Sequence, residues 1–173
     1  ATGSAGQIGD PNNRPDLFAD SVDANNVVGA RQGCRVFLSS SQSISQGNRP
    51  KIQFDSEVYD SGNNFDTSSH DWICPKNGLY AVNMQVTFEG GGDDQFRQAI
   101  IGTATDAAPT NEGALNVQKS SDSFDRFSVS TINKYSQGDG IAGYASNNDS
   151  TDTLDGGSLN IETFLEVAFL GGL

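Results

Sequence analysis

Histidine and cysteine, two residue types that often perform catalysis, are scarce in this chain, which has one histidine and two cysteines. Its one histidine, His70, occurs in the segment Ser68-Ser69-His70-Asp71, which has the composition of a turn. A Ser-His-Asp triad needs side chains that converge from separate elements, and neighbours in sequence do not form one. Gly90-Gly91-Gly92 lacks the Lys-Ser or Lys-Thr that completes a phosphate-binding loop. We therefore predict no catalytic residue, no residue that binds an organic cofactor, and a protein that is not an enzyme.

Carboxylates supply the one ligand set for a metal ion that the sequence suggests. Asp149, Asp152 and Asp155 precede Gly156-Gly157 in one segment, and calcium prefers oxygen ligands of this kind. The spacing of three residues differs from the alternation of an EF-hand loop, and a solvated acidic loop is the competing interpretation. Calcium is the only cofactor hypothesis that we carry forward, with these three aspartates as its ligands.

The two cysteines, Cys34 and Cys74, are too few for the disulfide framework of a small secreted domain. They could form one bridge, or they could be two small buried residues beside strands, and the sequence leaves both alternatives open. A thiol metal site is not expected, because no second thiol lies nearby and His70 is the only histidine.

The charge and the hydropathy of the chain argue against two classes of partner. Acidic residues outnumber basic ones by 22 to 10, which gives a net charge of -12. Binding to nucleic acid needs clustered cations, so we expect no such partner. No segment approaches the roughly 20 apolar residues that cross a bilayer, so we expect no membrane partner either.

Aspartate outnumbers glutamate by 17 to 5, and this bias resembles proteins from salt-saturated environments, where salt screens carboxylate repulsion. An ordinary acidic extracellular protein is the alternative.

Short apolar runs separated by Gly, Asp, Asn and Ser indicate the elements that carry these residues. The clearest run follows Asn77-Gly78, where Tyr80, Val82, Met84, Val86 and Phe88 occupy every second position. That period of two predicts a strand. The expected strands are Arg35–Leu38, Ile52–Phe54, Val58–Tyr59, Asn77–Phe88, Gln95–Ile101, Leu115–Val117, Phe124–Tyr135, Ile141–Tyr144 and Ile161–Leu170. The pattern predicts an all-β, antiparallel sandwich of two sheets joined by Greek-key links.

Two of the expected strands are suited to burial on both faces. Residues 77–88 contain no charge, although 18% of the chain is charged. The closing run 161–170 is apolar on both sides. A sheet of a monomeric sandwich covers only one of its faces, and the cores of protein interfaces are depleted of charge. We therefore predict contacts with other copies of the chain through Leu79, Ala81, Asn83, Gln85, Phe164, Ala168 and Leu170.

Residues 1–32 read as an irregular N-terminal arm or tether that precedes the domain. The segment is rich in Gly, Asn, Asp and Ala, and Pro11 and Pro15 lie close together in it. Its few apolar residues could anchor it against a partner, and a disordered tail is the competing interpretation. The predicted anchors are Leu17, Phe18, Val27 and Val28.

The order of several short motifs in the middle of the chain is specific. These motifs are Ile52-Gln53-Phe54-Asp55, Val58-Tyr59-Asp60, Asn64-Phe65-Asp66-Thr67, Trp72-Ile73-Cys74-Pro75 and Gly78-Leu79-Tyr80. Together they resemble the signature of the globular-head domain of the first complement component (its q subcomponent), within the tumour necrosis factor-like superfamily. Tyr135–Ile141 is similar to the Gly-Asp turn before the penultimate strand of that family, and Thr163-Phe164-Leu165 is similar to its closing strand. Ala81-Val82 and the absence of a glycine in the closing strand depart from its pattern.

This resemblance covers residues 33–173 and implies a jelly roll of ten strands that forms a tight homotrimer. It also implies that the sheet with the closing strand faces the threefold axis and that loops form the binding surface. No collagen-like stalk is present in the sequence, so complement-like effector functions are not implied.

The function that we expect from these features is structural or receptor-facing. A jelly-roll trimer with a short tether and a halophilic composition predicts a virion structural protein, such as a capsid decoration or the head of a fibre or spike, from a virus of a halophilic host. Its partners would be other virion proteins or a ligand on the host surface. The alternative is a secreted or cell-surface recognition module that binds glycan or protein through its loops.

Overall fold

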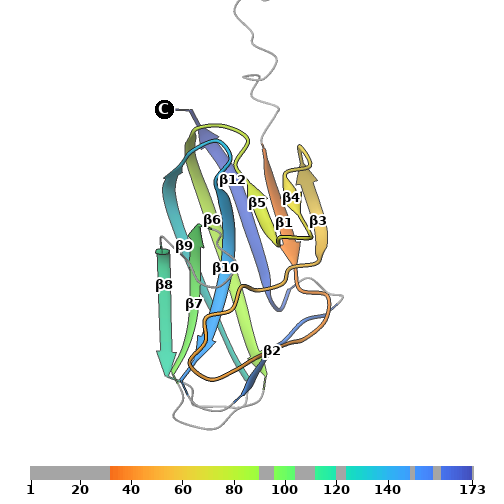
Figure 1. Ribbon diagram of the computed structural model, residues 1–173, viewed down its shortest axis with the longest axis vertical. Helices are drawn as coiled ribbons and strands as arrows, with labels where there is room; N and C mark the ends of the chain where they lie inside the picture. The colour runs from red at the N-terminus through yellow and green to blue at the C-terminus, as the bar shows by residue number, and fades with distance from the viewer. Residues whose placement is uncertain are drawn as a thin grey trace, which may run out of the picture. The chain divides into compact units, whose positions relative to one another are not determined.

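The computed structural model describes residues 32–89, 96–103, 112–119, 124–148, 151–157 and 161–172 of the 173-residue chain. The chain divides into two units, Ala1–Ala30 and Arg31–Leu173, and the described residues all lie in the second unit. They form strands and connecting segments without a helix (Figure 1). Accordingly, no helix in this part of the chain could cross a membrane.

The strands are antiparallel and form two sheets. The larger sheet has seven strands, in the order β2-β11-β6-β12-β1-β3, with β9 paired to the other edge of β6. Its members are β1 (Gly33–Phe37), β2 (Gln42–Ile44), β3 (Ser56–Ser61), β6 (Gly78–Glu89), β9 (Phe124–Tyr135), β11 (Asp152–Leu154) and β12 (Phe164–Gly171). The closing strand β12 therefore lies between β6 and β1, at the centre of this sheet.

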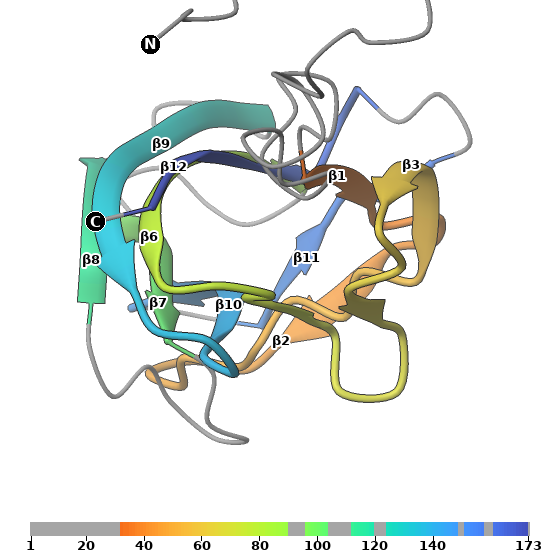
Figure 2. The same ribbon diagram turned by 90° about the horizontal axis from the view of Figure 1, so that it is seen from above.

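The smaller sheet has five strands in the order β4-β5-β10-β7-β8. Its members are β4 (Phe65–Asp66), β5 (Asp71–Ile73), β7 (Phe96–Thr103), β8 (Glu112–Lys119) and β10 (Gly140–Asn147). Seen from above, β9, β12 and β1 lie along one side of the sandwich, and β7 and β10 lie along the opposite side (Figure 2). The expectation of an all-β, two-sheet antiparallel jelly roll is confirmed, with 12 strands among the described residues.

Strand β6 shows why the sequence forms this sandwich. Its alternate residues Tyr80, Val82, Met84, Val86 and Phe88 are all buried between the sheets, as the period of two predicted. The residues between them point to the opposite side of the sheet, where Thr87 alone is buried. The alternation therefore fixes which face of the larger sheet packs on the core.

Aromatic rings fill one end of the core. Tyr80 is fully buried, and its ring makes edge or tilted contacts with Trp72, Tyr135 and Phe169 at centroid distances of 5.5, 5.9 and 5.1 Å. The Tyr80 hydroxyl donates to the Lys76 carbonyl at 2.6 Å, so its polar end is satisfied. These contacts join β5, β6, β9 and β12, and they hold the two sheets together.

One expected strand, Ile52–Phe54, is not a strand in the structure. Ile52 and Phe54 are buried, but only Lys51 makes a β-bridge, to Tyr144. The alternation of apolar and polar residues in this segment therefore reflects alternating burial beside β10. The segment does not form a strand with its own ladder of hydrogen bonds. The two cysteines are free and buried, so the alternative of two small buried residues holds and they are not bridged.

Candidate assembly face

The outward side of the seven-stranded sheet is the surface on which the predicted interface residues meet. We call it the outer face, and it comprises the side chains of β9, β6, β12, β1 and β3 that point away from the core. The pairing register sets these side chains in rows across the strands. One row is Ile132, Ala81, Ala168 and Gly33, and the next is Ser130, Asn83, Glu166, Arg35 and Tyr59. Both rows run across strands that are far apart in the sequence.

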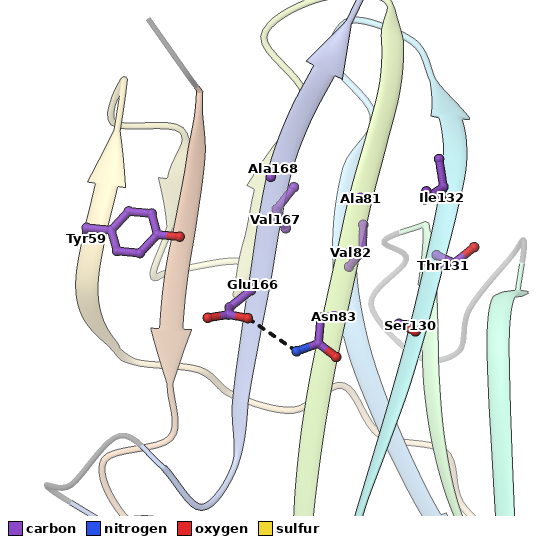
Figure 3. A pocket seen from close by; sticks show the side chains of 10 residues that line it. All are labelled: Tyr59, Ala81, Val82, Asn83, Ser130, Thr131, Ile132, Glu166, Val167 and Ala168. Atoms are coloured by element: carbon purple, nitrogen blue, oxygen red, sulfur yellow. Dashed lines mark hydrogen bonds between the residues drawn. The ribbon is translucent and has the colours of Figure 1, made fainter. Parts of the chain in front are cut away.

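A shallow depression of about 520 Å³ lies across the middle of the outer face. Ala81 and Ala168 lie over its centre, while Tyr59 and Ile132 come from strands on opposite sides of it (Figure 3). Ile132 is 67% exposed and Tyr59 is 50% exposed, so both present apolar surface to solvent. Small side chains between two large ones give this face a hollow shape that a second protein surface can fill.

Glu166 supplies the one carboxylate among the described residues that line the depression, and this carboxylate is bound within its own chain. One of its oxygens forms an ion pair with Arg35, and the other accepts a hydrogen bond from the Asn83 amide at 3.2 Å (Figure 3). The Arg35 guanidinium lies 3.8 Å from the centre of the Phe164 ring, so the pair also covers an aromatic face. A charge that is paired and hydrogen-bonded in this way can be buried at lower cost than an isolated one.

The environment of Tyr59 agrees with this electrostatic arrangement. Partial burial raises the pKa of its phenol, the negative charge of Glu166 raises it further, and Arg35 acts in the opposite sense. Tyr59 is therefore neutral over the physiological pH range and adds no charge to the depression.

The structure places all seven predicted interface residues on β6 and β12. Leu79, Ala81, Asn83 and Gln85 are half-buried on the outward side of β6. On β12, Ala168 and Leu170 are exposed, whereas Phe164 is buried beneath Arg35. The Gln85 amide donates to the Glu162 carbonyl at 3.0 Å, so part of its polarity is satisfied within the chain. Their proximity does not by itself test the predicted contact between copies, which stays a prediction.

Sequence reasoning missed four other residues of the outer face, namely Ile132, Tyr59 and the Arg35–Glu166 pair. Ile132 could have been found from the sequence, because it is apolar among polar residues on the same side of one strand. Those polar residues of β9 are Arg126, Ser128, Ser130 and Lys134. No sequence pattern could have identified the Arg35–Glu166 pair, since its members are 131 residues apart and only the pairing of β1 with β12 brings them together.

The predicted calcium ligands do not form a recognisable site in the described residues. Asp149 lies outside them, and Asp152 is buried in an ion pair with Arg97 at 2.8 Å. Asp155 is half-buried, and its backbone N–H donates to the Thr87 carbonyl. No group of three or more His, Cys, Asp or Glu residues suited to a metal occurs among the described residues. Calcium stays a prediction, and it would compete with Arg97 for Asp152.

The remaining predictions have different outcomes. The arm over residues 1–32 and its anchors Leu17, Phe18, Val27 and Val28 lie outside the described residues, except for Gln32. His70 lies in a turn between β4 and β5, as expected, with φ of 59°. Burial raises the pKa of the Cys74 thiol to about 12 and that of Cys34 further, so both thiols are protonated and unreactive.

The fold and this face define the class of protein as a two-sheet antiparallel jelly roll with a hollow, largely neutral sheet face. The solved structure of Eiger TNF from S. frugiperda is similar, with a TM-score of 0.60 over 83% of this chain and 95% of that chain. The two sequences are 12% identical, so the similarity shows the fold, which is a tumour necrosis factor-like jelly roll. The sequence matches no family model and no curated protein. The more specific resemblance to the complement globular head therefore stays a prediction.

Proposed function

We propose that this chain is a non-catalytic binding module that assembles as a homotrimer through its outer face. The observation that carries the proposal is the composition of that face at its centre. In the described part of the face, small and apolar side chains surround the carboxylate of Glu166, and Arg35 and Asn83 satisfy this carboxylate within the chain. A monomer would expose this surface to water, whereas an interface core requires apolar area, few charges and no unpaired charge.

The margins of the outer face support a contact between folded proteins. Arg126 and Lys134 stand at opposite ends of the β9 row, opposite Thr87 and Leu79 of β6. Charged residues at the ends and neutral residues at the centre reproduce the polar rim and apolar core of protein interfaces. We take the number of copies as three, because the resemblance of the sequence to complement globular heads implies a threefold arrangement about this sheet.

An exposed isoleucine on each sheet provides a matched test of the assembly. Ile132→Glu places a carboxylate beside the depression, and we expect it to convert a trimer into monomers in sedimentation velocity. Ile73→Glu makes the same change on the other sheet, where Ile73 is 36% exposed, and it should leave the trimer intact. A native chain that sediments as a folded monomer across micromolar concentrations would refute the proposal, as would dissociation by Ile73→Glu alone.

We also propose that the trimer decorates a virion surface as a capsid decoration or a fibre or spike head from a virus of a halophilic host. The support is the composition, with 17 aspartates among 22 acids, together with a compact trimeric head that suits local threefold positions. Immunoelectron microscopy of purified particles tests this location. Labelled particles are the expected result, and particles without label, with the chain found instead on cells or in the medium, would reject it.

The alternative location is the extracellular space or a cell surface, with the trimer binding a glycan or protein ligand. Its similarity in fold to a protein named as a TNF favours this candidate. In both cases we expect no enzymatic activity. The same fractionation separates the two candidates, since the chain would be recovered with particles in one case and with cells or medium in the other.

A further inference from the structure

Two depressions on the other side of the molecule are unused by the proposed assembly. They lie beside the segment of residues 46–51, which runs along β10. The Gly47 N–H donates to the Asn147 carbonyl at 2.9 Å, and the Ile52 N–H donates to the Gly143 carbonyl at 2.8 Å. The first depression has a volume of about 500 Å³ and lies by His70, and the second has about 450 Å³ and lies by Phe96. Arg49 borders both of them.

The linings of these depressions differ in charge from the chain as a whole. The chain has 22 acidic residues, yet none of the described residues that line either depression is acidic. Lys51 lines the first, but its ammonium is buried against Asp71 at 2.8 Å and is neutralised there. Arg49 is exposed, and a guanidinium has five donors, so it can bind a carboxylate while keeping another contact.

His70 presents a fixed hydrogen-bond acceptor to the first depression. Its Nδ1 lies 2.7 Å from the carbonyl oxygen of Phe54, which can only accept, so Nδ1 carries the hydrogen. In the neutral ring, Nε2 is then the acceptor. The backbone of His70 is held at φ of 59°, and its N–H donates to the Asp66 carbonyl at 2.7 Å. The ring is therefore positioned before any ligand arrives.

The second depression combines an aromatic surface with amide groups. Phe96 is 47% exposed, and its backbone N–H donates to Asn148 Oδ1 at 2.6 Å, which fixes the start of β7. The Gln98 side-chain oxygen accepts a hydrogen bond from the Ser146 hydroxyl at 3.1 Å, which leaves its amide nitrogen as the donor. The face of an aromatic ring attracts polarised C–H groups, and planar amides pair with hydroxyls.

We propose that the two depressions together bind an acidic oligosaccharide, whose sugar rings carry carboxylates. Arg49 binds a carboxylate between the two depressions, Phe96 packs against the apolar side of one ring, and His70 Nε2 accepts a hydrogen bond from a hydroxyl of another. The volumes fall in the range of small-molecule sites. Among the described residues the lining carries no acidic side chain, which lowers the repulsion that this acidic chain would otherwise exert on such a ligand.

Calorimetric titration with defined tetrasaccharides tests the proposal. The acidic probes are alternating glucuronate and N-acetylglucosamine, and a tetramer of mannuronate. The neutral probe is the tetramer of N-acetylglucosamine. We expect an acidic probe to bind at least about tenfold more tightly than the neutral one, and Arg49→Gln to abolish that difference. If neither acidic probe binds with a Kd below about 10 mM at about 0.1 M salt, the proposal is wrong.

Two further variants separate the roles of the two depressions. His70→Asn keeps a donor to the Phe54 carbonyl and tolerates the positive φ, but it removes Nε2. We expect it and Phe96→Ala each to weaken binding of the acidic probe about tenfold. Leu115→Ala is the matched control on β8 of the smaller sheet, where Leu115 is 45% exposed and lines neither depression, and it should leave binding unchanged. An equal loss in the control would overturn the site, and unchanged sedimentation of all variants keeps this result distinct from the assembly.

Discussion

The buried charge of Arg97 is neutralised by carboxylates of the same chain. The Arg97 side chain has no exposed surface, and it pairs with Asp152 at 2.8 Å and Asp125 at 2.6 Å while lying over the Phe88 ring. Burial raises the pKa of Asp152, and hydrogen bonding to the Thr153 amide and the charge of Arg97 oppose this rise. The carboxylate that we proposed from the sequence as a calcium ligand thus has a structural role beside β7.

Replacing Arg97 tests that structural role. Arg97→Met leaves Asp152 buried without its cation, and the expected loss is about 3–5 kcal/mol of unfolding free energy. The double variant Arg97→Met/Asp152→Leu removes the cation and its fully buried partner, and it leaves the Asp125 carboxylate, whose side chain is 15% exposed. It should recover a large part of that loss, because an apolar pair of similar volume is tolerated. Urea unfolding at one fixed protein concentration measures both variants. Equal destabilisation of the single and double variants would show that packing, and not the ion pair, sets the cost.

At the level of the elements, the long alternating strands were predictable and the short ones were not. Strands β6 and β9 have 12 residues each, so the alternation of buried and outward residues along them can be recognised in the sequence. Strands β2, β4 and β11 have three residues or fewer, and they exist because β11 bridges β2 to the end of β6 and β4 pairs with β5. Such strands depend on tertiary pairing, which no local pattern encodes.

The approach of β10 to β6 leads to a prediction at the same scale. A Cβ on Gly143 would lie 2.4 Å from Met84 Sδ and 3.1 Å from the Phe54 ring, and both side chains are fully buried. Gly143→Ala therefore forces the core apart, at an expected cost of about 1–3 kcal/mol in unfolding free energy. Gly157→Ala, where a Cβ meets no atom within 4 Å, is the control and should be neutral or slightly stabilising in urea unfolding. A neutral Gly143→Ala would mean that Met84 moves aside freely.

For the whole molecule, the sequence predicted the central strands of the outer face better than the residues at its sides. An uncharged β6 and a doubly apolar β12 were visible, and their pairing places Ala81 beside Ala168. Tyr59 could not be assigned to the same face, because only the order β12-β1-β3 brings β3 to it. The two depressions by Arg49 could not be predicted either, since they form where the segment of residues 46–51 crosses to β10 and meets the turn before β5.

The net charge of -12 gives a prediction for the whole chain. Carboxylates on one small surface repel one another at low ionic strength, and at about 1 M salt the Debye length falls to roughly 3 Å. We expect the Tm to rise as sodium chloride increases from about 0.1 M to about 1 M, most steeply at the lower end, because screening changes most there. Calorimetric scans at fixed protein concentration and pH 7 measure this rise.

Sodium sulfate separates screening from general salt exclusion. At equal ionic strength the two salts screen charges equally, whereas sulfate is the more strongly excluded from protein surfaces. Coincident Tm values at equal ionic strength would identify carboxylate repulsion as the cause and support adaptation to brine. A Tm that rises in sulfate alone would assign the effect to salt exclusion. A Tm that stays constant in both salts would remove the halophilic interpretation, because repulsion among the carboxylates would then not limit the stability of the fold.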